Sequence, residues 1–132
     1  MLSIDIEKLS DEFTKIHLRN LPFYGVIHHF TGKDKGSAHD HPFGFTSHIL
    51  YGGYVEKVYK VEPDGTWTSE VIHRQPGTVH NVEATDIHQI IELPEGECYT
   101  LIVLREKVRE WRFWKFDESG SQSRVWSEGD FE

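Results

Sequence analysis

The chain lacks several features that are typical of secreted or membrane proteins. Its 132 residues include one cysteine, Cys98, so no disulfide can form within the chain. It contains no run of about eighteen apolar residues that could form a transmembrane helix. The stretch MLSIDIEKLSDEF carries acidic side chains where a secretory signal carries a basic segment and an apolar run. The sequence therefore predicts a cytoplasmic protein.

Basic residues are scarce relative to acidic ones. Fourteen Lys and Arg stand against twenty-two Asp and Glu, which gives a formal net charge of -8 at pH 7. A surface of this charge repels the phosphate backbone of nucleic acids and anionic lipid headgroups. We therefore expect neither nucleic acids nor membranes among the partners.

The length of the chain predicts one domain over residues 1–132. A chain of this size can bury roughly two-thirds of the surface that its unfolded form exposes, which suffices for one core. Cys98 lies in the apolar stretch ECYTLIVL. We expect a buried, unreactive thiol there, because apolar surroundings disfavour the thiolate.

Most of the chain has the pattern of short strands separated by turns. Pro-Asp-Gly at 63–65, Pro-Gly at 76–77 and Pro-Glu-Gly at 94–96 mark turns between apolar or alternating segments. Short strands at this spacing favour an all-β sandwich or barrel, which we place over residues 22–117.

The two ends of the chain carry other patterns. Leu9, Phe13 and Ile16 fall at i, i+4 and i+7, which predicts a short N-terminal helix within residues 1–20. Residues 118–132 are rich in Ser, Gly and Glu, and we expect a loosely ordered tail there. Before this tail, the stretch EWRFWKF has aromatic side chains on both faces of a strand. Such a strand either joins two layers or packs against a second copy of the chain, as in a homodimer.

Histidines are concentrated in the stretch HDHPFGFTSH, residues 39–48. His39 and His41 are two apart, so on an extended segment both side chains leave the same face, with Cα atoms about 6.5 Å apart. Both imidazoles could then bind one metal ion, with a third ligand from another strand. An H-x-H pair alone is more often part of an exposed loop, so a second group of ligands is needed.

A second group lies in RQPGTVHNVEATDIHQIIEL, residues 74–93. Here His88 follows Gly77 by eleven residues and begins an apolar strand. With these two stretches the chain resembles the cupin superfamily, whose motifs are G-x5-H-x-H-x3,4-E-x6-G and G-x5-P-x-G-x2-H-x3-N. The interval from Gly77 to His88 is that of the second motif, and Gly53 falls where the first motif ends.

The chain departs from these motifs at several positions. Phe45 and Thr46 occupy the places of the metal-binding glutamate of the first motif, and Glu92 occupies that of the asparagine of the second. Three histidines are left as candidate ligands. This set resembles the branches of the superfamily that hold non-haem iron with three histidines.

The resemblance implies a cupin-type double-stranded β-helix, or jelly-roll barrel, with His39, His41 and His88 as the metal ligands. Three neutral imidazoles leave open positions on the ion, which suits Fe(II) and a dioxygenase reaction on a small-molecule substrate. Zinc, nickel and manganese also accept imidazole, so the identity of the metal is left open.

Further residues could complete or line this site. Strand alternation puts His48 on the face of Thr46, which makes it either a fourth ligand or a hydrogen-bonding neighbour of the ligands. Glu92, four residues after His88, could likewise bind the metal, hydrogen-bond a ligand or lie near the mouth of the barrel. The residues expected to line the pocket are Phe43, Phe45 and Thr46.

Two alternative functions stay open at this stage. The same barrel could hold a metal or a small ligand without turnover, which a closed four-coordinate site would favour. In the metal-free sugar-epimerase branch of the superfamily, a barrel histidine would act as a general base. That chemistry needs one base and an acid partner, and it does not explain three converging imidazoles.

Overall fold

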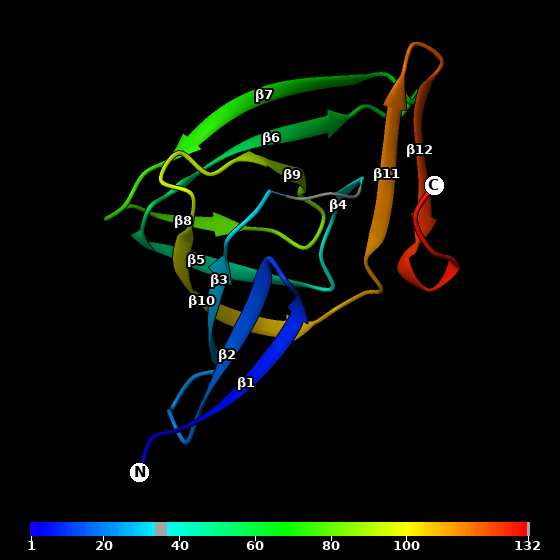
Figure 1. Cartoon of the computed structure of the whole chain (residues 1–132). Helices are drawn as coiled ribbons and strands as arrows, with labels where there is room; N and C mark the ends of the chain where they lie inside the picture. The colour runs from blue at the N-terminus through cyan, green and yellow to red at the C-terminus, as the bar shows by residue number, and fades with distance from the viewer. Residues whose placement is uncertain (34–36, 132) are drawn as a thin grey trace.

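The computed structural model of the chain describes residues 1–33 and 37–131 and consists almost entirely of β-strands (Figure 1). The strands are β1 (Ser3–Ser10), β2 (Phe13–Arg19), β3 (Gly25–Phe30), β4 (Ala38–His39), β5 (Phe43–Tyr51), β6 (Tyr54–Val61), β7 (Trp67–Arg74), β8 (Val79–Val82), β9 (Ile87–Glu92), β10 (Cys98–Lys107), β11 (Arg112–Asp117) and β12 (Gly120–Val125). A short 3₁₀ turn, η1 (Trp126–Glu128), follows β12. The predicted all-β class is confirmed. Among the described residues, no helix has the length and apolar character needed to cross a membrane.

The strands form two six-stranded sheets with antiparallel pairing. One sheet has the order β1-β2-β3-β10-β5-β8, and the other has the order β12-β11-β4-β9-β6-β7. Both sheets curve, and the chain passes from one to the other, as between β5 and β6 (Figure 1). Residues of both sheets line one cavity, so the candidate site lies between two layers.

The N-terminal segment is a β-hairpin, so the predicted helix within residues 1–20 is wrong. β1 pairs with β2, with Ile4 opposite Leu18 and Ile6 opposite Ile16, and β2 pairs in turn with β3. Apolar and polar residues alternate in IDIEK and TKIHLR, which is the period of a strand. The i, i+4, i+7 spacing that suggested a helix runs across the turn between the two strands.

The C-terminal segment is ordered by strand pairing, which corrects the expected loose tail over residues 118–132. Within the described part of that segment, β12 pairs with β11 along its whole length. Arg112 Nε donates to Ser123 Oγ at 2.8 Å, and Trp126 Nε1 donates to Glu110 at 2.6 Å. The polar composition suits an edge strand as well as a coil. The strands therefore extend beyond the predicted bounds of 22–117 at both ends.

Apolar side chains from both sheets form a core beside the cavity. Ile49, Tyr54, Ile90 and Cys98 pack in one cluster. Cys98 is fully buried, and burial raises the pKa of its thiol to about 11. A neutral and inaccessible thiol agrees with the unreactive cysteine expected from the sequence.

Gly52 and Gly53 carry the chain from β5 in one sheet to β6 in the other. Both have left-handed backbone conformations, with φ of 80° and 72°. A Cβ atom on Gly52 would overlap the carbonyl oxygen of Glu97. This turn therefore requires glycine both for its conformation and for the close approach of the neighbouring backbone.

We expect Gly52→Ala to lower the free energy of unfolding by about 3 kcal/mol or more, because left-handed strain of about 1–2 kcal/mol adds to the overlap with Glu97. Gly65→Ala is the matched control, since Gly65 has φ of 89° and no atom within 4 Å of the added Cβ. Urea unfolding followed by tryptophan fluorescence measures both losses. Equal losses in the two variants would show that the overlap contributes nothing.

Candidate metal centre

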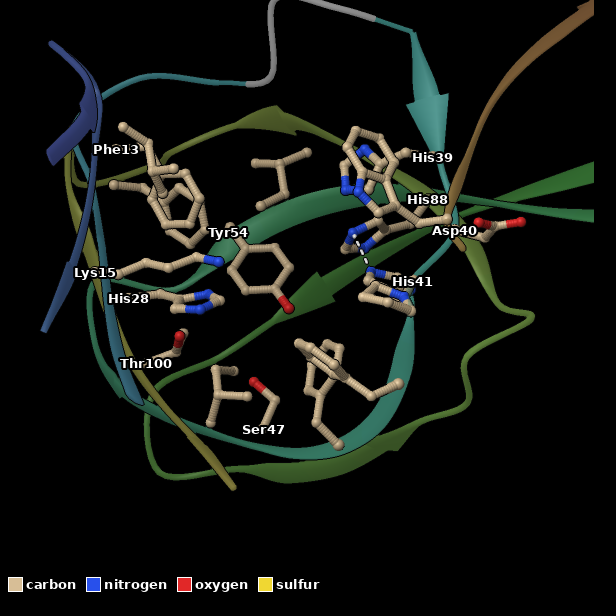
Figure 2. A pocket seen from close by; sticks show the side chains of 18 of the residues that line it. Phe13, Lys15, His28, His39, Asp40, His41, Ser47, Tyr54, His88 and Thr100 are labelled. Carbon is tan, nitrogen blue, oxygen red and sulfur yellow. Dashed lines mark hydrogen bonds between the residues drawn. The ribbon is translucent and has the colours of Figure 1, made fainter. Parts of the chain in front are cut away.

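The three predicted ligand histidines meet at one wall of the cavity. His39 ends β4, His41 follows two residues later, and His88 lies on β9 directly opposite His39 in the strand pairing. One possible ligand nitrogen from each ring lies within 4.8 Å of the other two. Figure 2 shows the three side chains gathered on the same side of the pocket. The pairing of β4 with β9 thus brings the H-x-H pair to the distant third histidine.

Two of the ring nitrogens, those of His41 and His88, are spaced as a shared metal ion requires. His41 Nε2 and His88 Nε2 are 3.2 Å apart. Two imidazoles bound to one ion at about 2.1 Å place their nitrogens about 3.0–3.4 Å apart, for bond angles between octahedral and tetrahedral. Neither ring would need a large movement to bind a divalent ion.

His41 is held in its neutral form. Its side chain is buried, and burial together with the nearby rings of His88 and His39 lowers its pKa well below the ordinary value. A neutral imidazole has a lone pair for a metal, whereas a charged one has none. Phe45 packs edge-on against this ring, with ring centroids 5.3 Å apart.

His88 is oriented by a buried carboxylate on the neighbouring strand. Its Nδ1 lies 2.7 Å from Oε1 of Glu56, a residue of β6 that is 3% exposed. Arg74 Nε donates to the other carboxylate oxygen, Oε2, at 2.5 Å. Burial by itself would raise the pKa of Glu56, but the hydrogen bonds and charges of His88 and Arg74 outweigh it and lower the pKa to about 2. An ionised carboxylate only accepts, so His88 donates from Nδ1 and presents the lone pair of Nε2 to the cluster.

Asp40 stands between the two ligands of the H-x-H pair and has a structural role. It is 2% exposed, and its side chain points away from the three rings (Figure 2). Its oxygens accept hydrogen bonds from the backbone N–H of Arg112 at 2.6 Å and from Trp114 Nε1 at 3.0 Å. The guanidinium of Arg109 lies 2.8 Å from the same carboxylate. Asp40 therefore anchors the H-x-H segment to β11.

The residues at the place of the missing glutamate lie on opposite faces of β5. Phe45 lines the cavity, as do Phe43 and Ser47. Thr46 lies on the other face, where its hydroxyl donates to Asn81 Oδ1 at 2.9 Å. This corrects the expectation that Thr46 lines the pocket, because alternation along β5 turns only the odd-numbered side chains inward.

His48 and Glu92 also lie outside the cluster, which corrects their expected roles as a fourth ligand or a neighbour of the ligands. His48 is on the outer face of β5, between Leu101 and Val79 of the adjacent strands. Glu92 is exposed at the end of β9, where the pairing with β6 is shifted. Alternation placed Thr46 and His48 on a common face, but that face is the outer one.

Sequence reasoning missed Glu56 and Arg74. The signal for Glu56 was weak: a single acid between Tyr54 and Val58 on one face of a strand suggests a buried carboxylate that needs a partner. The partner could not be identified, because His88 lies 32 residues away on another strand.

The cluster opens onto a cavity of about 540 Å³ between the two sheets. The lining is mostly aromatic and aliphatic, and it includes Phe43, Phe45, Ile90 and Ile102. A cavity in this range suits a small organic molecule. A molecule in this cavity would lie beside the three imidazoles.

Replacing Glu56 tests its role in orienting His88. We expect Glu56→Gln to weaken metal binding about 10- to 100-fold, the range found when the hydrogen-bond partner of a ligand histidine is changed. Glu92→Gln is the matched control, because Glu92 is exposed on the strand that carries His88 and should not affect metal affinity. Competition with a chromophoric chelator measures the affinities. Equal affinity in the wild type and both variants would contradict the role of Glu56.

Comparison with known proteins finds similarity in three-dimensional structure. No family model matches the chain, and no curated protein has a significantly similar sequence. The hydroxypropylphosphonic acid epoxidase from S. wedmorenis superposes with a TM-score of 0.57 at 14% identity, over 78% of this chain and 56% of the epoxidase. An oxalate decarboxylase variant from B. subtilis superposes with a TM-score of 0.56 at 16% identity, over 92% of this chain and 30% of the decarboxylase. The Drosophila melanogaster CENP-C cupin domain gives a TM-score of 0.56 at 8% identity, over 78% of this chain and 76% of that domain.

At these identities the similarity concerns the fold and not the reaction. The chain spans a little more than half of the epoxidase and less than one-third of the decarboxylase. Any activity must therefore be argued from the residues around the cavity.

Proposed function

We propose that this chain, which has the cupin fold, is a metal-dependent enzyme that acts on a small organic substrate, with His39, His41 and His88 as the metal ligands. The observation that carries the proposal is the convergence of three imidazoles, with ligand nitrogens within 4.8 Å of one another, at the wall of a large cavity. The depressed pKa of His41 and the orientation of His88 by Glu56 suit these rings to bind a cation.

Catalysis requires an open position on the metal, and an ion held by these three residues alone would have one. Among the described residues, the cluster that could hold an ion contains three histidines and no cysteine or carboxylate. Glu56 is engaged by His88 and Arg74, and Asp40 is engaged by β11. A closed four-coordinate site would favour a structural or sensory ion, whereas three ligands beside a cavity favour catalysis.

Iron(II) is the favoured metal, with zinc, nickel and manganese as alternatives. Iron(II) held by three neutral imidazoles would supply dioxygen chemistry, so the proposed reaction is a dioxygenase-like oxidation. One of the structurally similar proteins, HppE, has been solved as its iron(II) form, at 13% identity to this chain. That similarity supports the choice of iron and leaves the reaction to experiment.

The residues around the cluster orient the ligands and exclude water. Asp40 and Glu56 hold the two ligand segments in place from behind. Phe43, Phe45 and Ile90 present apolar surface to the cavity. Apolar walls displace bulk water from a bound molecule and so strengthen its electrostatic interactions with the centre.

Metal content tests the ligand set. We expect untagged wild-type protein to hold about one divalent ion per chain, and His39→Ala and His88→Ala to lose most of it, because each variant removes one of the ligands. His48→Ala is the matched control, since the same substitution on the outer face of β5 should leave the metal content unchanged. Elemental analysis measures all four proteins. An ion that is absent from the wild type, or retained in both ligand variants, would rule out the proposed centre.

Oxygen uptake tests the reaction class. Iron-loaded wild type should consume dioxygen with at least one member of a panel of thiols and diketones, and His88→Ala should consume none above background. A wild type that holds iron but consumes no oxygen with the whole panel would contradict the dioxygenase assignment. It would favour the alternative that the barrel binds a metal or small ligand without turnover.

The homodimer and the cytoplasmic location stay predictions. Contacts within the chain already engage both faces of EWRFWKF, because Phe113 lines the cavity and the ring of Phe116, on the other face, stacks on Tyr59 of β6 with centroids 4.1 Å apart. A second copy is therefore not required by that strand.

A further inference from the structure

A row of polar residues crosses the sheet that faces the ligand histidines. Lys15 on β2 is directly opposite His28 on β3, and His28 is directly opposite Thr100 on β10. All three residues line the cavity. Figure 2 shows Lys15 and His28 on the side of the pocket away from the three histidines, with Tyr54 between the two groups. The cavity thus has a candidate metal wall on one sheet and a polar wall on the other.

Lys15 brings a positive charge to the polar wall. Besides Lys15, the only Lys, Arg, Asp or Glu in the described lining is Asp40, whose carboxylate is turned away and bonded to β11. Glu7 is the residue opposite Lys15 on β1; its carboxylate lies 2.8 Å from Nε2 of His17, and the hydrogen bond from His17 together with the nearby charge of Lys15 lowers its pKa. The amino group of Lys15 lies 5.8 Å from the centre of the Phe13 ring, which also lines the cavity. The ammonium is therefore placed to receive an anion from within the pocket.

Thr100 and His28 add uncharged hydrogen-bonding groups beside this ammonium. Thr100 is 1% exposed, and its Oγ1 has no hydrogen-bond partner among the described residues. A buried hydroxyl without a partner is costly, which points to a group that a bound molecule satisfies. Burial, with the charge of Lys15 nearby, lowers the pKa of His28 to about 3. A neutral His28 can donate one hydrogen bond and adds no second charge.

We propose that the cavity binds a small organic acid, with its carboxylate held by Lys15, His28 and Thr100 and its other end beside the ligand histidines. This inference rests on the proposed function, since it treats the cavity as the substrate pocket of the same centre. Lys15 is the one cation in the described lining, so it balances the single negative charge of a carboxylate better than the double charge of a phosphate or phosphonate. Contacts at both walls would fix the orientation of the acid relative to the metal.

Pairs of charged and uncharged probes test the acid site. Butanoate, hexanoate and octanoate, each with its primary amide, are titrated into the protein as purified and again after treatment with a chelator. We expect at least one carboxylate to bind about tenfold or more tightly than its amide, because the amide loses the charge-assisted contact with Lys15. The preference should survive metal removal, because Lys15 lies on the wall away from the histidines.

Variants at the polar wall assign the preference to its residues. Lys15→Met should reduce the affinity for the carboxylate to that for the amide. Lys8→Met is the matched control, because Lys8 is an exposed lysine on the adjacent strand and should keep the preference. Thr100→Val should weaken carboxylate binding several-fold while leaving the thermal midpoint equal to or above that of the wild type, because it removes a buried hydroxyl that lacks a partner.

The outcomes separate this inference from the proposed metal centre. Equal binding of acids and amides by the wild type, no binding of any probe, or an unchanged preference in Lys15→Met would each overturn the acid site. If the protein holds metal through the three histidines but shows no preference for carboxylates, the result supports the metal centre and contradicts the acid site. If the protein prefers carboxylates through Lys15 but holds no metal, the result supports the acid site and contradicts the metal centre.

Discussion

The candidate centre depends on the pair of hydrogen bonds that the buried carboxylate of Glu56 accepts from Arg74 and His88. An ionised carboxylate in the interior costs several kcal/mol unless its oxygens are paired, and here each oxygen has a partner. The three residues lie on β6, β7 and β9, so the interaction ties together adjacent strands of one sheet. It also decides which nitrogen of His88 carries the proton, and therefore which one can bind a metal.

Asp40 performs the corresponding task for the other two ligands, since it anchors their segment to β11 from behind. Both acids support the histidines, and neither is among the groups that could bind the ion. With Phe45 and Thr46 at the place of the glutamate of the typical cupin, a bound divalent ion would keep its full charge, because neutral imidazoles do not offset it. A centre of this kind favours an anionic or electron-rich ligand at its open position. The ammonium on the opposite wall has the same preference, so both walls of the cavity suit an acid.

The polar wall exists because the N-terminal segment is a hairpin rather than a helix. As a strand beside β3, β2 turns Phe13 and Lys15 into the cavity and continues the row that runs through His28 to Thr100. A separate helix would have had no such register with β3. The predicted helix therefore gave no indication that Lys15 lines the cavity beside His28.

Local pattern in the sequence determined the all-β class and the buried thiol of Cys98, because strand period and apolar surroundings can both be read from neighbouring residues. The resemblance to the cupin motifs predicted His39, His41 and His88 as a set, and the structure brings these three side chains together. The tertiary structure alone decided which face of β5 is inside, so it separated Phe45 from Thr46 and His48. Only the tertiary structure shows that Glu56 hydrogen-bonds His88 and that Lys15 lies opposite His28. The members of each pair come from different strands, and packing of the whole sheet sets the register between those strands. Alternation along a strand defines two faces, and only the layer packed against it decides which of them meets the cavity.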